Sequence, residues 1–171
     1  MRIFPALFFL VLARPALAQP TLPVPRNLQA TYTKGTRSPS GQPGPNYWQN
    51  TADYDLNVTF NPATRRVAGT VEITYQNNSP DTLKQLWFKL YPNIYQKGAP
   101  RSRAFAPEDT SEGMKIEALT INGESFNVKK LTIEATNMAV PLRRALGVHQ
   151  AATVRATYSY ILNKGSHQRT G

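Results

Sequence analysis

Few side chains in this 171-residue sequence are of the types that carry out acid–base or metal chemistry. Histidine is the usual metal ligand and proton carrier near neutral pH, and the chain has two. His149 follows Gly147 in a predicted turn, and His167 lies in a polar tail. They are not spaced i, i+4 as the histidines of a helical zinc site are. We therefore interpret both histidines as solvated loop residues.

The acidic residues offer two further arrangements. Asp53 and Asp55 share one face of a predicted strand, as the paired carboxylates of a glycosidase would, but alternation directs polar residues outward on any half-buried strand. Glu108, Asp109 and Glu112 carry the oxygen donors that Ca²⁺ prefers, without the spacing of a calcium loop. No phosphate loop, G-x-S-x-G elbow or Ser/His/Asp set is present. The sequence therefore predicts no catalytic, metal-binding or cofactor-binding residue in this chain.

The elements that position these residues are predicted to be strands. Apolar and polar residues alternate over residues 53–60 and 67–75, and this period of two is typical of half-buried strands. In the first strand the apolar face consists of Tyr54, Leu56, Val58 and Phe60. Further strands are predicted over residues 83–91, 115–121, 126–133, 138–142 and 151–162, with a type I′ hairpin turn at Asn122-Gly123. No segment has a long helical period, so the chain is predicted to be all-β, as an antiparallel β-sandwich or saddle-shaped curved sheets.

The segment 83–91 differs from the other predicted strands because it is apolar on both faces. Such a strand is typical of a central position, or of one against which another element packs. A surface for docking a further domain is predicted at Trp87, Phe88, Tyr91 and Tyr95. The loop over residues 92–113 that follows has no convincing period, and loops of this length are usually functional or docked on another element.

The ends of the chain are predicted to lie outside the domain. A basic start and an apolar run are followed by Ala16 and Ala18, the small residues that a signal peptidase reads before Gln19. Residues 1–18 are thus expected to be a signal peptide, and the protein to be exported to the periplasm or the extracellular space. Residues 19–50 are rich in proline and are expected to form an irregular linker before a domain over residues 51–171. No later segment has the length of a transmembrane helix.

Composition and charge exclude some classes of protein. The chain has no cysteine, so disulfide scaffolds, thiolate zinc sites and cysteine nucleophiles are excluded. The formal net charge is +10, and from Lys129 to Gly171 seven basic residues stand against Glu134 alone. Such asymmetry favours an anionic surface or an acidic neighbouring domain. The basic doublets are not interleaved with aromatic residues, so nucleic-acid binding is not expected.

The order of the segments resembles a known family. The run YWQNTADYDLNVTF (residues 47–60) leads into VAGTVEITYQNNSPDTL (67–83), LWFKLYPNIY (86–95) and IEALTINGE (116–124). The later runs NMAVPL (137–142) and KGSHQRTG (164–171) continue the pattern. This closely resembles the N-terminal domain of the aminopeptidase N family of zinc metallopeptidases, the gluzincins. The most specific part is the aromatic strand that ends in Pro-Asn before the loop.

The resemblance implies a saddle-shaped β domain that packs on a thermolysin-like catalytic domain following it in the chain. In the family, that second domain holds the zinc ligands, the general base and the G-x-M-E-N motif, and none of these occurs in this sequence. The zinc and the peptide substrate would therefore belong to the parent enzyme, and this chain would be a structural domain of it.

Two other functions remain open from the sequence. One is a free-standing secreted β-sandwich that binds protein or glycan through residues 92–113. The other is a basic exported module that adheres to anionic surfaces, for which binding would fall steeply with salt.

Overall fold

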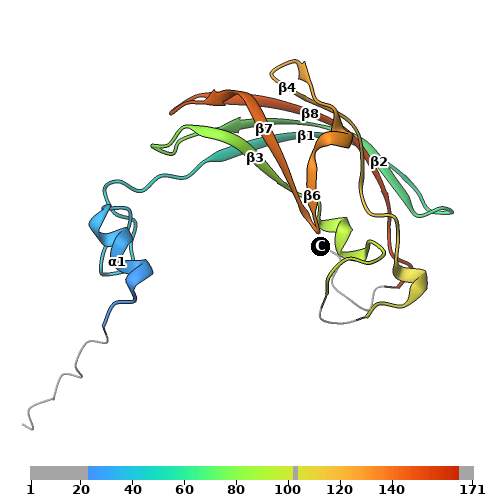
Figure 1. The fold of residues 1–171 in the computed structure, drawn as a ribbon, viewed down its shortest axis with the longest axis horizontal. Coiled ribbons are helices and arrows are strands. Elements are labelled where there is room, and N and C mark those ends of the chain that lie inside the picture. The colour runs from blue at the N-terminus through green and yellow to red at the C-terminus, as the bar shows by residue number, and fades with distance from the viewer. Residues whose placement is uncertain (1–22, 102–103, 166–171) are drawn as a thin grey trace, which may run out of the picture. The chain divides into compact units, whose positions relative to one another are not determined.

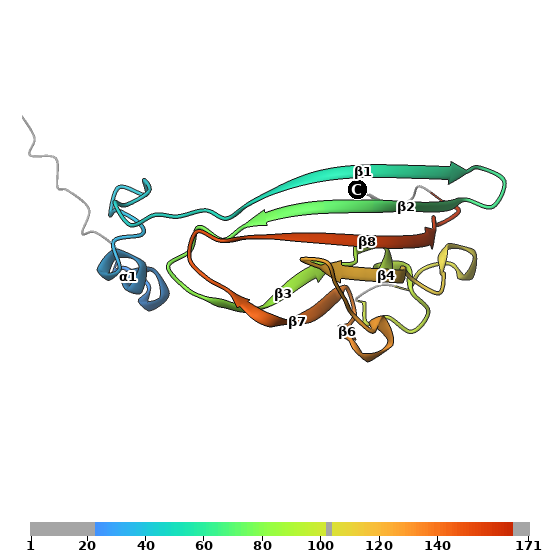
Figure 2. The ribbon, with the colours of Figure 1, turned by 90° about the horizontal axis from the view of Figure 1, so that it is seen from above.

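The alternating segments fold as two antiparallel sheets, shown in Figures 1 and 2. The computed structural model describes residues 23–101 and 104–165. The chain divides into two compact units, Met1–Tyr47 and Trp48–Gly171, and both sheets belong to the second unit. The prediction of an all-β fold with curved antiparallel sheets is therefore confirmed.

The larger sheet has the strand order β1-β2-β8-β4-β5. Its strands are β1 (Thr51–Asn61), β2 (Arg66–Gln76), β8 (Ala151–Ile161), β4 (Lys115–Ile121) and β5 (Glu124–Ser125). β1 and β2 pair without a bulge over their whole length, from Thr51 opposite Gln76 to Asn61 opposite Arg66. The hairpin predicted at Asn122-Gly123 joins β4 to β5, with φ values of +52° and +80°. Both are positive, as a type I′ turn requires.

The smaller sheet has the order β3-β7-β6 and consists of β3 (Leu83–Lys89), β7 (Asn137–Leu146) and β6 (Thr132–Glu134). β7 is its central strand and β3 lies at an edge, so of the two alternatives for residues 83–91 the central position is wrong. The segment leaves the sheet at Lys89 and continues as the 3₁₀ helix η1 (Tyr91–Tyr95). Both faces of β3 carry apolar residues, but only one of them is covered. Leu86 and Phe88 pack at the core, and Trp87 on the other face is exposed.

Short helices account for two further differences from the sequence-based prediction. Helix α1 (Arg26–Thr33) lies inside the segment expected to be irregular, because Pro25 only precedes its first turn and the next proline is Pro39. The strand expected over residues 126–133 is largely replaced by the 3₁₀ helix η3 (Val128–Lys130) before β6. In the described part of the chain no helix has the length and hydropathy needed to span a membrane.

The core of the second unit forms between the inner faces of the two sheets. Val140 and Val154, from opposite sheets, are 0% and 1% exposed and lie in one cluster of buried residues. The other buried members of this cluster are Leu86, Leu90, Leu119, Ile121, Met138, Leu146 and Ala152. The smaller sheet thus covers the part of the larger sheet formed by β8 and β4. Figure 2 agrees, because β3 and β7 lie on the side of β8 away from β1.

Candidate docking surface

The apolar face of β1 is exposed, although the alternation in the sequence predicts a half-buried strand. Its four large side chains, which we name the β1 stripe, are 62% (Tyr54), 56% (Leu56), 50% (Val58) and 52% (Phe60) exposed. Their ladder partners on β2 are Ile73, Val71, Gly69 and Val67. The expectation that this face of β1 is half-buried is therefore wrong. The face is exposed because the smaller sheet does not extend over β1.

The β1 stripe continues the face that forms the core. Tyr54 lies opposite Ile73, and Ile73 lies opposite Val154 of β8. Residues opposite one another in a ladder share a face of the sheet, so these three side chains form one row. Exposure along the row falls from 62% at Tyr54 to 1% at Val154. The inner face is therefore one continuous apolar surface of which only one end is covered.

The docking surface predicted from the sequence is only partly exposed. Trp87 and Tyr91 are 59% and 67% exposed, whereas Phe88 packs against the core cluster. Trp87 lies opposite Ala139 of β7, on the outer face of the smaller sheet. The prediction that Tyr95 belongs to an exposed docking surface is wrong, because Tyr95 is buried.

Tyr95 is buried by the loop that follows it. Its ring stacks on Phe105 at 4.8 Å between centroids, and the guanidinium of Arg101 lies 4.8 Å from the Phe105 centroid. Burial, together with the nearby carboxylate of Asp109, raises the pKa of Tyr95 above its ordinary value.

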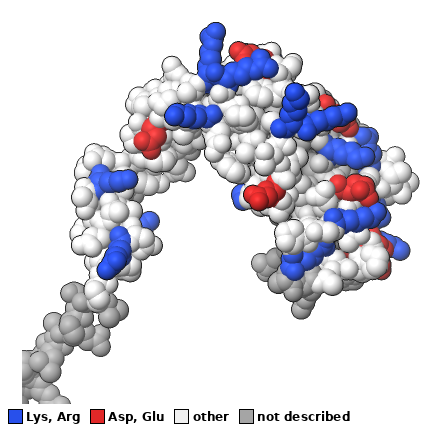
Figure 3. Space-filling view, viewed as in Figure 1, with Lys and Arg blue, Asp and Glu red and all other residues white. Residues whose placement is uncertain are grey.

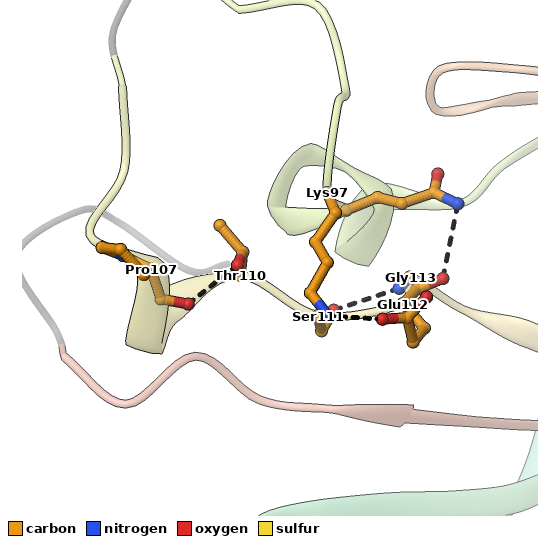
Figure 4. Close-up of polar contacts among 7 residues, drawn as sticks. Lys97, Pro107, Thr110, Ser111, Glu112 and Gly113 are labelled. Carbon is orange, nitrogen blue, oxygen red and sulfur yellow. Dashed lines mark hydrogen bonds and ion pairs between the residues drawn. The ribbon is translucent and has the colours of Figure 1, made fainter.

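The two ends of the loop over residues 92–113 are joined by hydrogen bonds and an ion pair (Figure 4). The backbone of Lys97 donates to the carbonyl of Ser111 at 2.9 Å, and that of Ser111 donates to the carbonyl of Tyr95 at 2.8 Å. The Lys97 ammonium lies 2.7 Å from the Glu112 carboxylate. This contact holds the pKa of Glu112 below its ordinary value. The 3₁₀ helix η2 (Pro107–Asp109) lies within the loop.

Asn93 gives the Pro-Asn motif a physical role. Its side chain is buried, donates to the carbonyl of Ala135 at 3.1 Å, and accepts from the backbone of Met114 at 2.7 Å. One amide therefore ties the start of the loop both to its end and to the turn between β6 and β7.

The acidic side chains that were examined for chemistry do not come together. Asp53 and Asp55 are exposed on the face of β1 opposite to the β1 stripe. Asp109 is buried and accepts from the backbone of Gly165 at 2.7 Å. Among residues 23–101 and 104–165, no group of three or more His, Cys, Asp or Glu side chains is placed to hold a metal ion. These residues therefore do not form a site that fits zinc or calcium.

The two histidines were expected in loops. His149 is exposed in the turn between β7 and β8, where its backbone N–H donates to the carbonyl of Asn77 at 2.8 Å. His167 lies outside the described residues, as do the predicted signal-cleavage residues Ala16, Ala18 and Gln19.

On the face of the second unit that Figure 3 shows, basic side chains are spread out, with acidic ones among them. Arg143 is engaged with its neighbours: it lies 3.4 Å from the Glu124 carboxylate, donates to the carbonyl of Ser125 at 2.9 Å, and covers the ring of Phe126. On the outer face of the larger sheet, Arg155 contacts Glu72 at 2.5 Å, which raises the pKa of the guanidinium. Arg143 and Arg155 are thus each paired with a different carboxylate.

One buried polar atom in the described residues has no hydrogen-bond partner, namely Nη1 of Arg65. Arg65 follows β1 in the turn to β2, two residues before Val67, the ladder partner of Phe60. It has a φ of +57°, and its carbonyl accepts from the backbone of Leu162 at 2.9 Å. A buried donor without an acceptor is unfavourable, so this guanidinium lowers the stability of the fold at the turn.

Sequence reasoning identified the residues of the β1 stripe but missed that they form a surface. Alternation separates the two faces of a strand and does not say whether a second layer extends over the apolar one. The position at a sheet edge was the missing information, and it depends on pairings between segments far apart in the chain.

Comparison with known proteins yields matches among solved structures. No protein-family model matches the chain, and no curated protein does. The chain is similar to a two-domain M1 zinc metallopeptidase variant bound to L-arginine, with 17% identity and a TM-score of 0.45. It is also similar to an M1 zinc metallopeptidase variant from Deinococcus radiodurans bound to a Tyr-Ser-Ala substrate, with 17% identity and a TM-score of 0.46.

Each of these two matches covers 70% of this chain and 22% of the other chain. The chain therefore spans less than a quarter of the length of the solved structures that it matches. Both are zinc metallopeptidases, the class of enzyme that the sequence resemblance names.

Proposed function

We propose that this chain is the N-terminal β domain of an exported zinc aminopeptidase, in which it supports a catalytic domain that follows it. The order of the sequence motifs from Tyr47 to Gly171 supports this function, and so does the arrangement of two curved antiparallel sheets. Export rests on the predicted signal peptide over residues 1–18.

The observation that carries the proposal is the β1 stripe. Four large apolar side chains, each at least 50% exposed, continue the core face of the larger sheet. A contiguous exposed apolar surface is typical of a site where another protein domain docks. The catalytic domain is the occupant that we propose, and its contact would bury the face that the smaller sheet leaves open.

The chemistry of peptide hydrolysis would lie outside this chain. When bound in the parent enzyme, zinc would activate water and polarise the scissile carbonyl. Among the described residues no group of three or more His, Cys, Asp or Glu side chains is placed to hold a metal ion, so in this proposal the domain that follows would hold the zinc. The role of this chain is to hold the catalytic domain in place.

The first experiment reads the coding DNA beyond the codon for Gly171 and measures the mass of the native exported product. The proposal expects an open frame that continues into H-E-x-x-H and a downstream glutamate. A stop codon, with a native mass that matches residues 19–171, would overturn it.

A second experiment tests the surface itself. An apolar fluorescent dye is expected to bind the isolated chain, and Leu56→Ser is expected to reduce that binding because it removes the centre of the β1 stripe. Thr70→Ser is the matched control, since Thr70 is exposed on the opposite face of the same sheet. Equal dye binding by both variants would contradict a docking role for the stripe.

Trp87 favours a second candidate, a glycan-binding module. Its indole is 59% exposed on the outer face of the smaller sheet, opposite the small side chain of Ala139. An exposed indole with an apolar body offers a stacking surface to a sugar ring. Retention on immobilised polysaccharide that is lost in Trp87→Ala, and kept in Trp48→Ala, would favour this candidate.

A further inference from the structure

Among the described strands, β1 has the longest outer edge that carries no lysine, proline or bulge. An edge strand presents unpaired N–H and C=O groups, and proteins usually blunt such an edge with lysine, proline, a bulge or a very short strand. β5 has two residues and β6 has three. β3 carries Lys84 and Lys89 and has an irregular register near Leu83. β1 has eleven residues in unbroken register, without proline or lysine.

We propose that β1 pairs with β1 of a second copy of this chain, antiparallel and about a two-fold axis at Asn57. Each copy would contribute the same edge, so that the two larger sheets join into one. This contact uses the backbone edge of β1, whereas the proposed docking of a catalytic domain uses its apolar face. The pairing therefore does not depend on the proposed function.

The side chains of β1 are complementary to themselves in this register. Antiparallel pairing about Asn57 places Tyr54 opposite Phe60 and Leu56 opposite Val58 of the partner copy. All four side chains of the β1 stripe would then have an apolar neighbour across the junction. Aromatic and aliphatic pairs of this kind are the main side-chain stabilisation between adjacent strands.

The charges on the other face agree with the same register. The two acids of β1, Asp53 and Asp55, lie opposite Asn61 and Thr59 of the partner copy, so no like charges meet. Asn61 is itself paired with Arg66 of its own β2, which places a guanidinium in the row of Asp53. A two-fold axis at Asp55 would instead place this aspartate opposite its own copy, and like charges directly opposite are destabilising.

Cysteine cross-linking of the full chain tests both the pairing and the register. The sequence has no cysteine, so Asn57→Cys introduces its only thiol. Residues on the axis would have Cα atoms about 4.5–5.5 Å apart, which lies within the range of a disulfide. Asn57→Cys is expected to form a covalent dimer under mild oxidation. Thr70→Cys, exposed on the same face of β2, is the matched control and is expected to remain monomeric under denaturing, non-reducing conditions.

A charge variant tests the same contact without a covalent cross-link. Asn57→Asp places two carboxylates opposite each other on the axis and is expected to raise the Kd of the dimer about fivefold. Part of this loss is expected to return at high salt, because salt screens exposed charges. Thr70→Asp adds the same charge to β2 and is expected to leave the Kd unchanged.

Mass measurement by light scattering over a range of concentrations gives the remaining outcomes. A dimer whose Kd responds to Asn57→Asp and not to Thr70→Asp supports the proposal. A chain that stays monomeric at all concentrations would overturn it. A dimer that responds to neither change, or cross-links equally through position 70, would also overturn it, because the contact would then lie elsewhere.

Discussion

At the scale of single residues, Asn77 joins two turns that are far apart in the sequence. Its side chain is fully buried and donates to the carbonyls of Asp81 at 2.9 Å and Gly147 at 3.0 Å. It accepts from the hydroxyl of Ser79 at 2.6 Å. The turn after β2 is thereby joined to the turn between β7 and β8 through one buried amide.

Replacement of Asn77 by alanine is expected to lower the free energy of unfolding by about 2–3 kcal/mol, because it removes the donor to the buried contact with the Leu146 carbonyl and the acceptor of the buried Ser79 hydroxyl. Urea denaturation followed by tryptophan fluorescence measures the change. Asn78→Ala is the control, because that side chain donates only to the carbonyl of Gln49 in an exposed contact. Equal losses in the two variants would contradict the role assigned to Asn77.

Tyr95 predicts a dependence of stability on alkaline pH. Its pKa is raised by burial, so the folded state retains the phenol proton at a pH where the unfolded chain releases it. The stability that this group contributes is therefore fully present below pH 10.0, its ordinary pKa, and is lost as pH rises above that value. Tyr95→Phe is expected to match the wild type at pH 7 and to exceed its stability above pH 10.

Urea midpoints measured between pH 7 and pH 11 test this expectation. Tyr91→Phe removes an exposed hydroxyl from the same 3₁₀ helix and is the control. If the stability of Tyr95→Phe falls with pH as steeply as that of the wild type and of the control, the proton is not retained by Tyr95.

At the scale of elements, local periodicity predicted β1, β2, β4 and β8 of the larger sheet, and the Asn122-Gly123 pair predicted the hairpin. Alternation separates strand from helix within a few residues, and the Asn-Gly pair adopts the positive φ values that its turn needs. The edge position of β3 and the exposure of β1 were not predictable in this way. They depend on where β7 packs, and that is decided by contacts between segments far apart in the chain.

The exposure of the residues in the predicted docking surface also depends on contacts with distant segments. Trp87 and Tyr95 look alike in sequence, as aromatic residues near one strand end, yet one is exposed and the other buried. The difference arises because Phe105, ten residues further along a loop without a period, folds back onto Tyr95. No pattern within residues 83–95 contains that information.

Gly69 positions β1 against β2. A Cβ at this residue would lie 2.4 Å from the carbonyl oxygen of Asn57, a backbone atom that moves only if β1 moves. Gly69→Ala is thus expected to lower the free energy of unfolding by about 1–3 kcal/mol. Gly147→Ala is the control, since its nearest contacts are the end of the Gln150 side chain. Equal denaturation midpoints for the two variants would contradict this expectation, because β1 would then move away from the added methyl group without a loss of stability.

At the scale of the whole molecule, the chain divides into two units, Met1–Tyr47 and Trp48–Gly171. The hydrophobic core and both sheets lie in the second unit. The first contains α1, in which no residue is buried. Stability is therefore expected to reside in the second unit.

Removal of residues 19–47 is accordingly expected to change the free energy of unfolding by less than about 0.5 kcal/mol, the range of changes that avoid the core. Chemical denaturation of the shortened and full chains gives the comparison. A large loss of stability in the shortened chain would show that the first unit contributes to the core.

The position of β8 determines how this protein reaches its fold. β8 is the last of the described strands to be synthesised, yet it lies between β2 and β4 in the larger sheet. As the chain leaves the ribosome, β1 and β2 have a local partner in each other, while β4 has none but the two-residue β5 until β8 emerges. Pairing of distant segments slows folding. The larger sheet can therefore close only after β8 has emerged, so the folding of this unit is expected to be completed late.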